Sequence, residues 1–131
     1  MFSRSIVLAG LIGFWIDITL TILISTVGFA LLGISTPEQL QFSNPAHILV
    51  GLVLPAMMTM IGGAVAGALA MLNPQPAGAL VGGFGLFLDL LMGSDPGAPH
   101  ALTFLIAQCV ATVLAALSAT FAARYRLRAG R

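Results

Sequence analysis

Residues 10–18, GLIGFWIDI, and residues 82–90, GGFGLFLDL, follow one pattern 72 positions apart. In each stretch two glycines stand three positions apart, and three apolar residues with a central aromatic residue then lead to an aspartate. The aspartates, Asp17 and Asp89, lie within long apolar runs. A carboxylate is costly in such a run if the run crosses a bilayer, and it then usually has a structural or functional reason.

The composition of the chain favours lipid over water as its surroundings. Of the 131 residues, 59% are hydrophobic and only 7% are charged, and the mean hydropathy is +1.07. A soluble domain is about one quarter charged, so these few charges cannot cover a surface that faces water. The length suits a single domain, residues 1–131, and a net charge of +1 argues against a nucleic-acid partner.

Four apolar segments predict an all-α membrane protein, because a spanning helix needs about 20 mostly apolar residues. The predicted helices cover about residues 5–34, 46–72, 77–93 and 100–123. The first is so long that we expect it to tilt, protrude or break near Gly28. Pro55 is expected to kink the second.

The arginines predict the orientation of these helices. Arg4 precedes the first helix, and the other four arginines follow residue 123, whereas loops 35–45 and 94–99 contain neither Lys nor Arg. The positive-inside rule then places both termini in the cytoplasm. We expect the protein in the inner (plasma) membrane of a bacterium. The arginine-rich end, RYRLR, is either an interfacial anchor or a site for anionic lipid.

The chain also shows a possible internal duplication. A helix with an aspartate, a loop and a histidine at the start of the next helix occur twice, with the histidines in PAHIL (45–49) and APHAL (98–102). Such halves would be parallel repeats related by an axis along the membrane normal. Both aspartates lie about 12 residues into their helices, or about 18 Å, and would share one depth.

Small and polar residues gather on one face of each predicted helix. The glycines expected to mediate helix packing are Gly10, Gly13, Gly62, Gly78, Gly82 and Gly85. Membrane helices pack through small residues because their backbones can then approach closely. We therefore expect these faces to meet in the middle and enclose both aspartates, with Thr21 and Gln108 as polar neighbours.

Three interpretations of the aspartates remain open. In the first they are neutral or hydrogen-bonded packing residues, since none of the spans contains Lys or Arg. In the second, two carboxylates at one depth bind a cation or relay protons. In the third, His47 and His100 act as haem or metal ligands. Neither CxxCH nor HxxxH occurs, and we expect no cofactor and no metal.

The sequence contains no pattern typical of a catalytic site: there is no Ser-His-Asp constellation, no HExxH and no phosphate-binding loop. We therefore expect a non-enzymatic accessory or oligomeric subunit of a membrane assembly. Its partners would be the bilayer and either copies of itself or a larger complex. The alternative is a small proton- or cation-coupled transporter or channel. The chain resembles the small multidrug transporters in size and in its first-helix acid, but its second acid and its loops depart from that family.

Overall fold

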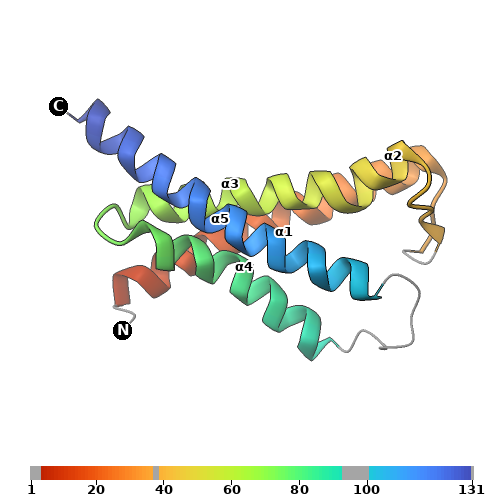
Figure 1. Cartoon of the computed structure of the whole chain (residues 1–131), viewed down its shortest axis with the longest axis horizontal. Coiled ribbons are helices and arrows are strands. Elements are labelled where there is room, and N and C mark those ends of the chain that lie inside the picture. The colour runs from red at the N-terminus through yellow and green to blue at the C-terminus, as the bar shows by residue number, and fades with distance from the viewer. Residues whose placement is uncertain (1–3, 37–38, 93–100, 131) are drawn as a thin grey trace.

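The computed structural model describes residues 4–36, 39–92 and 101–130. Within these ranges the fold is all-α, and the prediction of four helices is confirmed (Figure 1). They are α1 (Arg4–Leu32), a continuous second helix made of α2 (Pro45–Ile48), the π-helical segment η2 (Leu49–Val53) and α3 (Leu54–Leu69), then α4 (Pro74–Leu91) and α5 (Ala101–Ala129).

Three of these helices are long and apolar enough to cross a membrane. They are α1 (29 residues), the helix Pro45–Leu69 (25 residues) and α5 (29 residues), and the most apolar 18 residues of each have a mean hydropathy of 2.2, 2.2 and 2.0. The 18-residue α4 is not among them. Three such helices suggest an integral membrane protein.

The helices form a bundle with α3 and α4 at its centre. α3 packs against α1, α4 and α5, and α4 packs against α1, α3 and α5. The two ends of the chain lie at one end of the bundle, and α2 lies at the other (Figure 1). The C-terminal part of α5 projects beyond the neighbouring helices at the end that holds the termini.

Of the three outcomes expected for this long helix, a break at Gly28 does not occur, because α1 runs through this residue without interruption. Gly28 is buried against the second helix, where an added Cβ would lie 2.6 Å from Val50 Cγ1. The glycine therefore serves a close helix contact rather than a bend.

α1 instead ends at Leu32, and the next residue, Gly33, has a φ of 69°. Gly33 N–H donates to the carbonyl of Ala30, and Ile34 N–H donates to that of Phe29. These two bonds form a Schellman motif, whose left-handed position favours glycine. Ile34, the residue after Gly33, is buried, and an apolar residue is common at this position of the motif.

Pro55 alters the second helix through the turn that precedes it. Proline has no N–H to donate, and its ring crowds the carbonyl four residues earlier. The helix is π-helical over Leu49–Val53, and Leu54 N–H donates to the carbonyl of Leu49, five residues back. This wider turn, inside an otherwise α-helical run, is where the helix departs from regular geometry.

Three helix boundaries differ from the prediction by three residues or more. The second helix ends at Leu69 rather than near residue 72. α4 begins at Pro74 rather than near residue 77, because a proline in the first helical turn lacks only an N–H that has no partner there anyway. α5 continues to Ala129 rather than ending near residue 123. Arg126 in this extension donates from Nη1 to the carbonyl of Ala68 in α3, so the extension is held against its neighbour.

The interior is built from small residues. Ala66, Ala77 and Val81 have no exposed surface. On α5 the buried residues recur every fourth position: Ala111, Ala115, Ala119 and Ala123. Gly63 and Gly67 of α3 lie directly against the backbone of α5, so these two helices approach too closely for a Cβ at either position.

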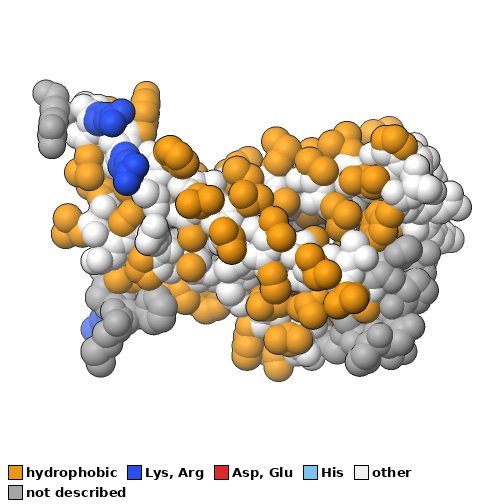
Figure 2. All heavy atoms as spheres, in the orientation of Figure 1, with side chains coloured by type: hydrophobic (Ala, Val, Ile, Leu, Met, Phe, Trp, Pro, Cys, Tyr) orange, Lys and Arg blue, Asp and Glu red, His pale blue; other side chains and the backbone are white. Residues whose placement is uncertain are grey.

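Large apolar side chains cover the outside of the bundle. Leu31 is 82% exposed, Trp15 72% and Phe121 69%. Figure 2 shows hydrophobic side chains spread along the whole length of the visible face, with arginines at the end that holds the termini. An apolar coat of this extent is costly in water and suits a hydrocarbon environment.

Candidate functional site: a buried carboxylate between α1 and α3

Asp17 lies in the contact between α1 and α3 and is only 5% exposed. Two threonine hydroxyls donate to its Oδ1 atom: Thr21 from the same helix, at 3.0 Å, and Thr59 from α3, at 3.1 Å. Thr59 is also buried. Among the described residues no buried side-chain nitrogen or oxygen lacks a hydrogen-bond partner, so this polar cluster is internally satisfied.

Helix geometry and glycine packing bring these groups together. Asp17 and Thr21 are four positions apart and therefore lie on the same face of α1. A Cβ added at Gly62 would lie 2.5 Å from the carbonyl oxygen of Gly13 and 3.0 Å from Asp17 Cβ. Only glycine at this crossing allows α1 and α3 to come close enough for Thr59 to reach the carboxylate.

The Thr59 hydroxyl lies within 3.1 Å of two acceptors, Asp17 Oδ1 and the carbonyl oxygen of Pro55. A hydroxyl has one hydrogen but can also accept. A protonated Asp17 could donate to Thr59 while Thr59 donates to Pro55, and all three groups would then be paired. An ionised Asp17 would instead compete with Pro55 for the single hydrogen. The local geometry thus accommodates a neutral carboxylic acid without another partner.

Asp89 has a different environment, and the expectation that both aspartates are enclosed is wrong. It is exposed near the end of α4, between the exposed residues Phe87, Leu90 and Leu91. None of the described residues donates a hydrogen bond to its carboxylate. The described bundle therefore does not bring the two aspartates into a shared site.

Gln108 does not join Asp17 either. Its Nε2 donates to the carbonyl of Gly82, 3.1 Å away, and lies beside Gly85. Gln108 therefore ties α5 to α4 rather than serving a carboxylate. The six predicted packing glycines all lie on helix contacts: Gly10, Gly13, Gly62, Gly78 and Gly82 are buried, and Gly85 is half-buried.

His47 already uses one ring nitrogen within the fold. Gln41 N–H donates to His47 Nδ1 at 2.9 Å, so the ring proton of the neutral histidine lies on Nε2. A metal ligand needs a free lone pair, and this arrangement leaves none on either nitrogen. His100 lies outside the described residues. No cluster of three or more potential metal-ligating His, Cys, Asp or Glu side chains occurs in the described part of the chain.

Sequence reasoning missed the role of Thr59 and the contacts of Gly63 and Gly67. A signal for Thr59 was present, since it lies on the same helical face as His47, Pro55 and Gly62. Gly63 and Gly67 form a second small face of α3, turned toward α5. α3 needs this second face because it packs against α1, α4 and α5. The helical pattern of one segment does not show how many neighbours that segment has.

Comparison of the chain with protein-family models, with curated proteins and with solved structures found no match. Inferences about function therefore rest on the described geometry. The cluster of Asp17, Thr21 and Thr59 can hold a proton and can join two helices. Its buried position between closely packed backbones suits packing better than the passage of a solute.

Proposed function

We propose that the protein is a non-enzymatic subunit of a membrane assembly, with four membrane-embedded helices and both termini in the cytoplasm. The arginines support the orientation: Arg4 and the described arginines of α5 are all exposed, and the start of α1 and the end of α5 that carry them lie at the same end of the bundle (Figure 1). A reporter fused after Gln41 should read the outside of the cell. A cytoplasmic signal there would contradict this orientation.

The observation that carries the subunit proposal is the exposure of Asp89. It lies two residues before the end of α4 and about 22 Å from its start. With the start of α4 at one edge of a hydrocarbon core about 30 Å thick, Asp89 lies inside the core, about 8 Å from the other edge. Acidic side chains at such depths almost always face protein or water rather than lipid. A neighbouring protein chain that covers this side of α4 and pairs with Asp89 would remove the free-energy cost of exposing a carboxylate to lipid.

Asp17 supports the same proposal from the interior. Its carboxylate is paired with threonines of the same chain, so the bundle core needs no outside cation. The outward-facing carboxylate is the one that needs a partner. The partner is then another copy of the chain or a different subunit with a donor at that depth.

Cysteine cross-linking in native membranes tests the proposal, because Cys109 is the only cysteine. In a Cys109→Ser background, Leu90→Cys places a thiol beside Asp89, at a site that is 67% exposed. We expect a cross-linked adduct, whose mass distinguishes a second copy from a different subunit. Adding Asp89→Leu should reduce the adduct several-fold.

Leu31→Cys is the matched control for this experiment, since Leu31 is even more exposed, at 82%, but lies on α1. It should give little adduct under the same conditions. Equal adducts from both positions, or none from Leu90→Cys, would contradict a partner at the Asp89 side of α4.

A small proton- or cation-coupled transporter is the second candidate, and the Asp17 cluster favours it. A buried carboxylate that shares a hydroxyl hydrogen with a neighbouring helix is able to take up and release a proton. Purified protein in liposomes would then carry a proton flux that Asp17→Asn abolishes. An undiminished flux in this variant, or no flux in the wild type, would exclude this role for Asp17.

A further inference from the structure

We propose that α4 and α5 form a binding site for an anionic phospholipid, with an acyl chain in the groove between the helices and the phosphate at Arg124 and Arg128. The inference rests on the proposed membrane location. The site is a groove on the surface of the bundle. The groove is separate from the Asp17 cluster and from the Asp89 side of α4.

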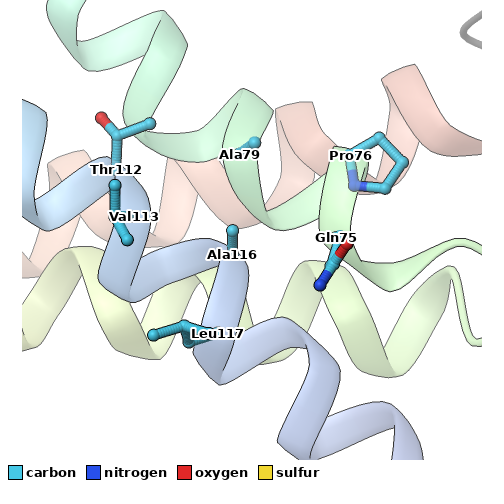
Figure 3. A pocket seen from close by; sticks show the side chains of 7 residues that line it. All are labelled: Gln75, Pro76, Ala79, Thr112, Val113, Ala116 and Leu117. Carbon is cyan, nitrogen blue, oxygen red and sulfur yellow. The ribbon is translucent and has the colours of Figure 1, made fainter.

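The groove is formed by one face of each helix (Figure 3). Pro76 and Ala79 line it from α4, and Val113, Ala116 and Leu117 line it from α5. Its lining is mostly apolar and it opens to the outside of the bundle, so an aliphatic chain can enter from the bilayer. At 1.5 Å per residue, Val113 and Leu117 lie about 6 Å apart along α5, a length that suits a segment of an acyl chain.

The same face of α5 leads from the groove to two arginines. At 100° per residue, Val113, Leu117, Arg124 and Arg128 fall within about 60° of the helix circumference. Arg124 lies about 10 Å beyond Leu117 along the axis. A phospholipid whose chain occupies the groove therefore has its headgroup at the level of these guanidinium groups.

Arg126 fixes the rotation of this part of α5. It points to the opposite side, where it donates to the carbonyl of Ala68 in α3. The bond also places a cation near the C-terminal end of α3, where it is favourable for the helix dipole. Because Arg126 is committed to α3, Arg124 and Arg128 are held on the groove side, and both are exposed.

The charge distribution favours an anionic headgroup over a zwitterionic one. No Asp or Glu occurs in residues 39–88 or 96–131, so neither α5 nor the part of α4 that lines the groove supplies a carboxylate to neutralise the arginines. Each cation near an anionic membrane surface contributes about 1 kcal/mol. Two arginines then favour an anionic lipid by about 30-fold.

The test is lipid retention by the full chain in nanodiscs that contain equal amounts of phosphatidylglycerol and phosphatidylcholine, followed by native mass spectrometry. The wild type should retain phosphatidylglycerol preferentially. Arg124→Gln with Arg128→Gln should weaken this retention about 30-fold, whereas Arg124→Lys with Arg128→Lys keeps the charges and should preserve most of it. Arg4→Gln removes a cation at the same end but away from the groove, and should change little.

Ala116→Leu tests the groove independently of charge, because the larger side chain fills the space of the acyl chain. It should lower retention of both lipids. Equal retention of the two lipids by the wild type, or unchanged retention in either the double Gln variant or Ala116→Leu, would overturn the inference.

Trp15, the only tryptophan, separates failure of this site from failure of the membrane proposal. It is 72% exposed on α1, so lipids brominated along their acyl chains should quench its fluorescence. Lost lipid selectivity with intact quenching would count against the phospholipid site alone. No quenching in the wild type would count against the membrane location itself.

Discussion

The two Gly-x-x-Gly stretches have similar sequences but opposite surroundings. In α1, Gly13 crosses Gly62 and the following Asp17 is buried against Thr59. In α4, the corresponding Gly85 meets only the amide of Gln108, and Asp89 is exposed. A shared motif therefore does not determine a shared site, since the neighbouring helix decides what the aspartate contacts.

The register of the two hairpins explains the difference. Gly13 crosses Gly62, which is 15 positions after His47, whereas Gly85 meets Gln108, only 8 positions after His100. The second pair of helices is thus shifted by seven positions, or about 10 Å, relative to the first. Thr112 stands 12 positions after His100, as Thr59 stands 12 positions after His47. It consequently lies against Gly82 rather than near Asp89.

We expect the largest difference in stability between the variants Gly13→Leu and Gly85→Leu. A Cβ at Gly13 would run into the backbone carbonyl of Gly62 and would lie 2.8 Å from Val81 Cγ2, so Gly13→Leu should destabilise the bundle by about 3 kcal/mol. At Gly85 the closest atom is the mobile amide end of Gln108, at 2.7 Å, and the cost should be about 1 kcal/mol. Unfolding in detergent measures both, and equal costs would show that the two crossings are equivalent.

The variants Asp17→Leu and Asp89→Leu should show the next largest difference in stability. The first change removes the acceptor of two threonine hydroxyls in a buried contact and should cost about 2 kcal/mol. The second replaces an exposed carboxylate, and the stability of the isolated bundle should change by less than about 0.5 kcal/mol. A comparable loss from Asp89→Leu in detergent would mean that this aspartate also supports the fold of the single chain.

The smallest contrast in stability concerns Thr59 and Thr112, each of which stands 12 positions after a histidine. Thr59→Val keeps the shape but removes a hydrogen bond between helices, so unfolding should become easier by about 1 kcal/mol. Thr112 donates within its own helix, to the carbonyl of Gln108, and Thr112→Val should stay within about 0.5 kcal/mol. Calorimetry of the two variants checks this. If Thr112→Val were the more harmful, the assignment of Thr59 as the partner of Asp17 would be wrong.

The helical pattern of the sequence was sufficient to predict the number of helices, because long apolar runs separated by Pro, Gly and Asn leave few alternatives. The start of α4 was missed because Pro74 and Pro76 are typical both of a turn and of a first helical turn. The environment of Asp89 could not be predicted, because it depends on the position of α5 along the axis of α4. A periodic face of small residues allows two helices to pack in several such positions.

In the proposed membrane location, the protonation state of Asp17, which is hydrogen-bonded to Thr59, would decide how the bundle responds to membrane voltage. Moving one elementary charge across the whole membrane is worth about 2.3 kcal/mol per 100 mV. With a proton on Asp17, the hydrogen-bonded Asp17, Thr59 and Pro55 groups would carry no net charge, and the field would exert no net force on them. Without that proton, a negative charge would be fixed to α1 deep in the field, and the packing of α1 against α3 would become voltage-dependent.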